Sequence, residues 1–353
     1  MTDPVEAVLT ASSAGVSLDG LVVERTPAGY TVSVNGVAST DLGEVEATEQ
    51  LREVPEHVEN WAFWQRVGGV GSARRAFLRF CEHAGAIEHA DDRHAALADG
   101  LERTWGQLVV RTSLTGDGDR RYSLRHERDR ERPESALERV ADLPTLRDLA
   151  RRDESGAYRP LRTAPTLQCG WVHTDLDHET LVRAVETVYP ATIANWHRER
   201  EGRLDVTHWD ETATRQTGIY EVVGDLPRPA VDWLAAACCD DEACVKRREW
   251  DAAAADPLEV PRGEGTIPCR EPCSVAIAAA RQFAIQELET EREWTTSLTR
   301  SEVGQLISLL EETTTAADSP RAGAVAEPTN QYRLRYLRAK RFGDETAPFE
   351  SED

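Results

Sequence analysis

Five of the seven cysteines of this chain fall within one stretch, Cys238–Cys273. They form two groups, CCDDEAC at 238–244 and CREPC at 269–273, and 24 residues lie between the groups. The spacings are Cys238-x5-Cys244 (or Cys239-x4-Cys244) and Cys269-x3-Cys273. Two close groups on a longer loop are typical of four thiolates that converge on a metal centre. The fold of this region must therefore bring both groups together.

Two metal centres suit four thiolates: a 4Fe–4S cluster or a structural Zn²⁺ ion. The gap inside the first group favours the cluster, because zinc pairs are usually spaced by about two to four residues. The second group runs into SVAIAAARQFAIQEL, a strong helix candidate. With Pro272 near the first helical position, Cys273 would lie in the first turn, where free N–H groups favour an anionic ligand.

Basic residues flank the cysteines and would compensate the charge of four thiolates. They are Lys246, Arg247, Arg248 and Arg270. Adjacent residues seldom ligate the same iron, so we expect one of Cys238 and Cys239 to bind and the other to pack beside the site. The sequence leaves that choice open. A disulfide pair is not expected, because a reducing compartment keeps thiols free.

The charge of the chain is strongly acidic, with 41 basic and 63 acidic residues and a net charge of −22. Lysine occurs only at Lys246 and Lys340, so nearly all the positive charge is arginine. This balance predicts a protein adapted to molar salt, which screens self-repulsion. It argues against nucleic-acid binding, which needs a basic face. The sequence also contains no apolar run of membrane-spanning length and no signal peptide, so we expect a cytoplasmic protein.

The pattern of elements predicts a multi-domain α+β protein. We expect a mixed hairpin and helical region at 1–150, an α+β unit at 151–225, a mainly helical cluster domain at 226–312 and a flexible tail at 313–353. Expected strands are 21–25, 30–37, 108–114, 121–126, 167–174, 204–209 and 219–223. Expected helices are 60–67, 73–84 capped by Ser72, 92–103, 178–189 capped by Asp177, 193–200, 230–238, 273–292 and 301–312.

Other candidate residues are weaker. Arg215 stands beside Gly218 in a polar segment where a backbone could approach a ligand, and its guanidinium could pair with substrate carboxylates. Cys81 and Cys169 are isolated, and we expect both in the core. The basic run Arg333–Arg341 could bind an anionic partner or fold back on the acidic body. The sequence shows no recognisable catalytic acid, base or nucleophile, so whether the chain is an enzyme stays open.

Several stretches resemble a known family, the iron–sulfur cluster-binding and stabilising-domain proteins associated with small-type cobaltochelatases that act on sirohydrochlorin. The stretches are YPATIANW (189–196), LDVTHWDETATRQTGIY (204–220), CVKRREW (244–250) and PCREPCSVAIAAAR (268–281). The resemblance implies a 4Fe–4S cluster on Cys238 or Cys239, Cys244, Cys269 and Cys273. The chelatase domain that some members carry has no counterpart here, which implies a separate accessory protein.

The cysteine spacing alone is also similar to the cluster signature of sirohaem-dependent sulfite and nitrite reductases, whose remaining fold is not recognisable here. The leading hypothesis is a 4Fe–4S accessory or redox protein for tetrapyrrole metallation in cobalamin or sirohaem synthesis, with a chelatase or an electron donor as partner. The alternatives are a redox enzyme that acts on a bound tetrapyrrole and a zinc-stapled interaction module.

Overall fold

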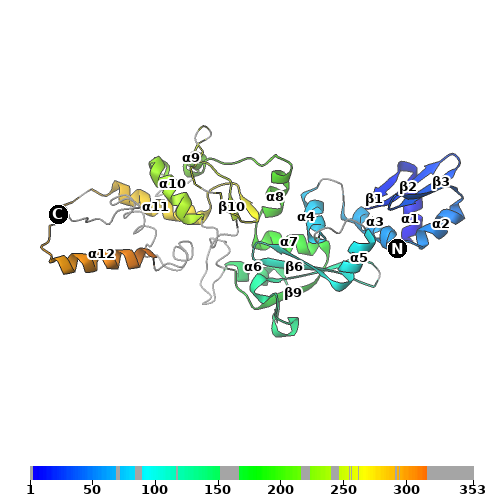
Figure 1. The fold of residues 1–353 in the computed structure, drawn as a ribbon, viewed down its shortest axis with the longest axis horizontal. Coiled ribbons are helices and arrows are strands. Elements are labelled where there is room, and N and C mark those ends of the chain that lie inside the picture. The colour runs from blue at the N-terminus through cyan, green and yellow to red at the C-terminus, as the bar shows by residue number, and fades with distance from the viewer. Residues whose placement is uncertain are drawn as a thin grey trace. The chain divides into compact units, whose positions relative to one another are not determined.

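A computed structural model gives the structure of the chain. It describes residues 3–68, 72–83, 90–116, 118–151, 167–215, 223–239, 246–253, 255, 257–260, 262–290, 292–293 and 295–315. The chain divides into two compact units, Met1–Arg147 with Cys169–His197 and Asp148–Gln168 with Arg198–Asp353. Helices and strands occur together in both units, which confirms the predicted α+β, multi-domain class (Figure 1).

Residues 3–67 form a small module around an antiparallel sheet. Its elements are α1 (Pro4–Ala11), β1 (Val16–Leu18), β2 (Leu21–Thr26), β3 (Gly29–Val34), β4 (Val37–Leu42), α2 (Glu44–Arg52) and α3 (Pro55–Val67). The four strands lie in chain order, and Leu21, Val23 and Val32 place their side chains in its core. The predicted hairpin is confirmed as β2 and β3, but the second strand ends at Val34. A turn at Asn35-Gly36 then leads into β4, which the sequence analysis missed.

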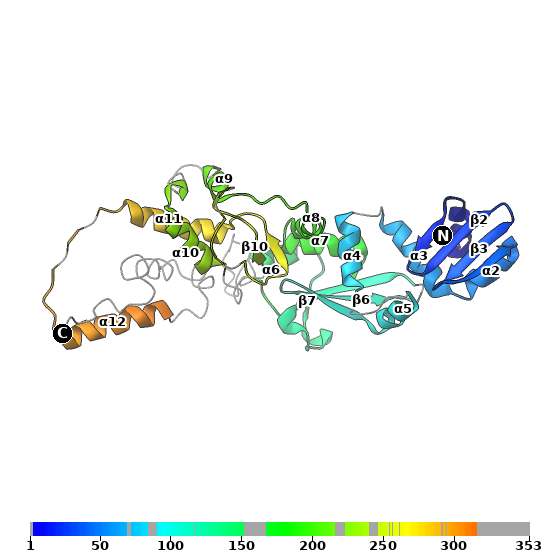
Figure 2. The same ribbon diagram turned by 45° about the horizontal axis from the view of Figure 1, so that its top comes forward.

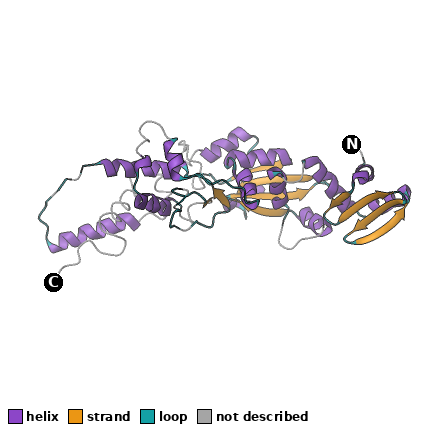
Figure 3. Ribbon diagram, turned by 90° about the horizontal axis from the view of Figure 1, so that it is seen from above, coloured by secondary structure: helices purple, strands orange, loops and turns teal. Residues whose placement is uncertain are grey.

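A second, five-stranded sheet forms the rest of the first unit. Its strands are β5 (Leu101–Trp105), β6 (Leu108–Leu114), β7 (Arg120–His126), β8 (Glu138–Arg139) and β9 (Trp171–Leu176), in the order β5-β6-β7-β9-β8. The neighbouring helices are α4 (Ala73–Cys81), α5 (Ala90–Asp99), α6 (Leu143–Arg151), α7 (His178–Val188) and α8 (Thr192–Arg200). Helix α7 packs on β7 and β9, and α5 packs on β6. The two sheets are separate (Figure 3).

Local signals placed some of these elements correctly. Ser72 accepts a hydrogen bond from the Arg75 amide at the start of α4, and Asp177 does the same for Thr180 at the start of α7. The predicted helix 92–103 is wrong at its end, because Gly100 adopts a φ of 89° and stops the helix. Residues 101–105 then pair with β6 as a strand. Pairing along the sheet overrides the helical preference of this segment.

A largely buried ionic network joins the N-terminal module to helices α4 and α5. Asp19 accepts two hydrogen bonds of 2.6 Å from Arg79, one of 2.7 Å from Arg93 and one of 2.9 Å from Asn60. Burial alone would raise the pKa of Asp19, but these partners outweigh it and hold the pKa well below its ordinary value. The Nε atom of Arg120 lies 2.9 Å from Oε1 of Glu82.

The second unit contains the two cysteine groups. Its described elements are α9 (Trp209–Thr214), α10 (Arg228–Cys238), β10 (Lys246–Arg248), β11 (Ile267–Cys269), α11 (Ser274–Leu288) and α12 (Arg300–Thr315). Helices α10 and α11 lie side by side (Figures 1 and 2), and β10 pairs with β11 in parallel. The largest buried side chains of their shared core are Trp209, Trp250 and Phe283.

Several predictions for the second unit need correction. The predicted strand 204–209 is wrong, because residues 203–208 are irregular and Trp209 begins α9. The basic segment Lys246–Arg248 forms β10, a strand that the sequence did not predict. Residues 219–222 and the basic run 333–341 lie outside the described residues. Among the helices that the structure describes, we find none with the length and apolar character that a membrane crossing needs.

Candidate metal centre

The loop Cys269–Cys273 is fixed by contacts at each of its first three residues. Cys269 ends β11, and its carbonyl oxygen accepts a hydrogen bond of 3.0 Å from the Glu249 amide. The Arg270 carbonyl oxygen accepts one of 3.0 Å from the Thr207 amide. The Cys269 thiol donates to the Glu271 carbonyl oxygen, with Sγ and O 3.0 Å apart. Segments distant in sequence therefore hold this loop in a defined shape.

Cys273 occupies the N-cap of α11, and its carbonyl oxygen accepts a hydrogen bond from the Ile277 amide. The sequence predicts Pro272 near the first helical position and Cys273 in the first turn. The helix begins instead at Ser274, one residue after Cys273. The physical consequence is unchanged. An N-cap residue lies near the positive dipole end of the helix, which favours negative charge.

The adjacent cysteines at the end of α10 lie in different surroundings. Cys238 is the last helical residue and is completely buried in the core. Cys239 is the C-cap residue, half-buried at the edge of that core, and its amide donates to the Ala235 carbonyl oxygen. Cys269 and Cys273 are also half-buried and pack against the same core. The structure therefore brings Cys239, Cys269 and Cys273 to the boundary of one apolar cluster.

Arg248 supplies positive charge next to these cysteines. It pairs in register with Cys269 across β10 and β11, so both side chains project from the same face of the two-stranded ribbon. Its guanidinium donates to the carbonyl oxygens of Trp250 and Val260. Burial lowers the pKa of Arg248, and the nearby Cys239 thiolate opposes that effect. The structure therefore places a buried positive charge close to Cys239 and Cys269.

The other basic residues near the cysteines either form ion pairs with carboxylates or are less buried than Arg248. Arg247 contacts Glu199 and Glu249, and Arg262 also contacts Glu249. Lys246 and Arg270 are half-buried. Lys246, Arg247 and Arg248 thus lie on β10, which pairs with the strand that ends at Cys269.

The fourth cysteine, Cys244, lies outside the described residues. Among the residues that the structure does describe, no three Cys, His, Asp or Glu side chains converge on a single-ion site. A cubane cluster distributes its four thiolates over four iron atoms, so its ligand sulfurs need not meet at one point. The donor set of three half-buried thiols fits a cluster that a fourth cysteine completes.

A buried polar atom without a partner lies in the same core. The indole Nε1 of Trp209 has no hydrogen-bond partner among the described residues, although the side chain is only 1% exposed. The adjacent His208 also has a buried, unpartnered Nδ1 atom. Buried donors normally have acceptors. An acceptor that belongs to a bound cluster would satisfy one of these atoms, which is a second sign that the core fits such a group.

Arg215, the predicted ligand for substrate carboxylates, lies beside the cysteine loop. It caps the C-terminal end of α9, and its guanidinium contacts the Glu271 carboxylate at 3.0 Å. Glu271 stands between Cys269 and Cys273 in the chain. The sequence analysis placed Arg215 in a ligand-binding segment but did not foresee this pair, because nothing local links residues 56 positions apart.

The two isolated cysteines differ from one another. Cys81 is completely buried, as predicted, and burial raises the pKa of its thiol well above the ordinary value. Cys169 is exposed, so its expected place in the core is wrong. It precedes Gly170 in the irregular segment that leads into β9.

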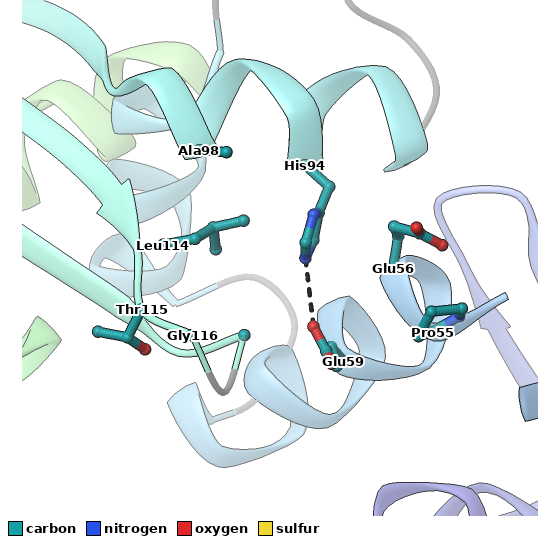
Figure 4. Close-up of a pocket in the computed structure, with 9 residues that line it drawn as sticks. Pro55, Glu56, Glu59, His94, Ala98, Leu114, Thr115 and Gly116 are labelled. Atoms are coloured by element: carbon teal, nitrogen blue, oxygen red, sulfur yellow. Dashed lines mark hydrogen bonds and ion pairs between the residues drawn. The ribbon is translucent and has the colours of Figure 1, made fainter.

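A pocket of about 400 Å³ lies in the first unit, far in sequence from the cysteines. Figure 4 shows His94 of α5 pointing toward Glu59 of α3, with Nε2 and Oε2 3.2 Å apart. Glu56 lies at the same pocket, and Ala98 and Leu114 form part of an apolar wall. The lining residues come from three separate segments, so no local sequence pattern indicates this pocket.

Three family models match parts of the chain. Residues 90–200 match the DR2241 stabilising domain, residues 201–282 match a 4Fe-4S iron-sulfur cluster binding domain, and residues 1–69 match a domain of unknown function, DUF7348. The first two matches confirm the predicted resemblance to cluster-binding, stabilising-domain proteins. The second supports an iron–sulfur cluster as the cofactor and gives no support to zinc.

A solved structure with detectable similarity is that of DR2241 from Deinococcus radiodurans, described as a multi-domain protein with structural similarity to chelatases and two additional novel domains. The sequence identity is 33%, over 52% of this chain and 39% of the DR2241 chain, with a TM-score of 0.43. This chain thus spans about two fifths of the length of that relative. No curated protein matches the sequence.

Proposed function

We propose that the second unit holds a 4Fe–4S cluster on Cys239, Cys244, Cys269 and Cys273. The observation that carries the proposal is the position of three half-buried thiols on one core, within the segment that matches a 4Fe-4S binding domain. A bound cluster of this type supplies one-electron transfer. The chain orients the thiols through the Cys269 loop and the start of α11, and its apolar core limits the access of water.

Burial favours Cys239 over Cys238 as the first ligand. Cys238 is fully enclosed by the core, so a cluster bound there would displace packed apolar side chains. Cys239 shares the half-buried position of Cys269 and Cys273, and the charge of Arg248 acts on it. We therefore assign Cys238 to packing and Cys239 to ligation.

Anaerobic purification with counts of iron, sulfide and zinc tests the cluster. Four irons and four sulfides per chain, with an EPR signal after reduction, are expected; zinc without sulfide would refute the proposal. Cys239→Ser and Cys238→Ser form a matched pair for the ligand. We expect Cys239→Ser to lose most of the iron and Cys238→Ser to retain it, and the reverse order would refute the assignment.

We further propose that the cluster protein serves tetrapyrrole metallation, as an accessory or redox partner of a chelatase that acts on sirohydrochlorin in cobalamin or sirohaem synthesis. Its support is the resemblance of the stretches around residues 189–281, and the stabilising-domain match at residues 90–200. A chelatase or an electron donor is the expected protein partner. Absence of any change in the metallation rate of a small-type chelatase upon addition of the holo-protein would refute this role.

Arg215 is the residue that we propose for the substrate carboxylates. Its side chain is 54% exposed and paired with Glu271, so an incoming carboxylate would compete with Glu271 for the guanidinium. Arg215→Gln should therefore weaken sirohydrochlorin binding, whereas Glu271→Gln should strengthen it. Titration monitored by tetrapyrrole absorbance measures both. Equal affinities for wild type and both variants would show that this ion pair plays no part in binding.

A further inference from the structure

The unpartnered indole N–H of Trp209 has a defined place in the cysteine core. The Trp209 side chain is 1% exposed, and its ring lies 5.9 Å from that of Trp250, between centroids. Its Nε1 atom has no hydrogen-bond partner among the residues described. An N–H group that is removed from water without an acceptor destabilises the fold. The position of this donor therefore requires an explanation beyond packing.

Backbone contacts bind the segment around Trp209 to the cysteine loop. The Trp209 amide donates to the Asp251 carbonyl oxygen at 2.7 Å, and the Thr207 amide donates to that of Arg270 at 3.0 Å. Arg270 directly follows Cys269, and Asp251 lies two residues beyond Glu249, which bonds to the Cys269 carbonyl oxygen. Trp209 and the three half-buried thiols pack on one core. These contacts tie the segment that carries Trp209 to the loop that carries Cys269.

We propose that Trp209 donates its indole N–H to a sulfur atom of the bound cluster and so raises the reduction potential of the cluster. This inference rests on the proposed function. Thiolate and sulfide sulfurs accept hydrogen bonds, and such bonds are one of the factors that set cluster potentials. A donor stabilises the form with more negative charge, which is the reduced form. Trp209 acts as a positioning residue that tunes the cluster and does not ligate it.

Selective isotope labelling tests the hydrogen bond directly. The holo-protein is prepared with tryptophan ¹⁵N-labelled at the indole nitrogen, reduced with dithionite, and examined by pulsed electron–nuclear double resonance. We expect a ¹⁵N coupling and an exchangeable proton coupling that disappears in D₂O. Both should be absent from Trp209→Phe and present in Trp250→Phe, which removes an indole from the same core. A reduced wild-type cluster without ¹⁵N coupling overturns the proposal, whatever the stability of the variants.

Redox titration gives an independent readout. Trp209→Phe should have a lower reduction potential than wild type. The equilibrium constant for reduction should fall by about threefold to tenfold, and a tenfold fall corresponds to about 59 mV for one electron. Trp250→Phe should stay within twofold of wild type. Equal shifts in both variants would indicate altered packing and overturn the specific role. Iron and sulfide are counted first: a chain without them refutes the proposed function itself, whereas a loaded cluster with no Trp209 effect refutes only this inference.

Discussion

The ion pair between Glu82 and Arg120 offers a sharp test of the buried network. Both side chains are 1% exposed, and the Nε and Oε1 atoms lie 2.9 Å apart. Glu82→Gln preserves the shape of the side chain but leaves the guanidinium without its counter-ion. Removal of one member of a buried pair costs about 3–5 kcal/mol. Arg120 keeps the Asn60 and Gly118 acceptors, so we expect the lower end, about 3 kcal/mol.

Chemical and thermal unfolding measure this loss. For a unit of this size, about 3 kcal/mol corresponds to a fall of about 6–12 °C in Tm. The matched control is Asp119→Asn, because Asp119 pairs with Arg66 at 2.7 Å on the surface, where their side chains are 36% and 52% exposed. That change should cost at most about 1 kcal/mol. Molar KCl should abolish the control effect but not the Glu82→Gln effect. A Glu82→Gln loss below about 1 kcal/mol, or one that salt removes, would refute the argument.

Three further predictions concern the first unit. The depressed pKa of Asp19 means that its contribution to stability is complete above about pH 4. Below that pH the unfolded chain binds a proton more readily than the folded chain, so the contribution falls. Asp19→Asn should flatten the pH dependence of the free energy of unfolding below about pH 4, and an unchanged slope would contradict this. Burial, aided by the Arg128 charge, lowers the pKa of His126 to about 4. The unfolded chain therefore takes up this proton at a higher pH than the folded chain, so the free energy of unfolding is highest above about pH 6.5 and falls down to about pH 4. NMR titration should show a neutral His126 ring at pH 5.5, and a charged ring would be contrary evidence. Gly36→Ala should lower the free energy of unfolding in urea by about 1 kcal/mol, because φ is 85° at this position. No atom lies within 4 Å of the added Cβ, so the cost comes from the backbone conformation and not from a clash. A neutral effect would show that the turn adapts.

Local sequence signals predicted much of the first unit. The side chains of Ser72 and Asp177 mark helix starts, because each acts on backbone groups a few residues away. The strand β4 was missed although Asn35-Gly36 is a strong hairpin signal. The strand β5 was missed for a different reason: its assignment depends on pairing with β6, which no local pattern reveals.

Cysteine spacing and the following helix predicted the candidate ligands of the metal centre, and this ligand set stays a prediction. The choice between Cys238 and Cys239 could not be made from sequence, because it depends on where the α10 helix ends relative to the core. The orphaned indole of Trp209 was equally invisible, since a missing hydrogen-bond partner is a property of the packed structure. The four-part domain division stays a prediction.

The charge composition and the buried contacts follow one physical logic. Guanidinium groups are more weakly hydrated than ammonium groups and donate in several directions. Arg93, Arg120, Arg125 and Arg248 accordingly lie buried, where they meet carboxylates or backbone carbonyl oxygens. The excess carboxylates of the chain repel one another on the surface, and salt screens that repulsion but barely affects the buried contacts. Adaptation to molar salt, which stays a prediction, would thus concern the exposed carboxylates, while the arginine contacts around the metal centre should persist at low salt.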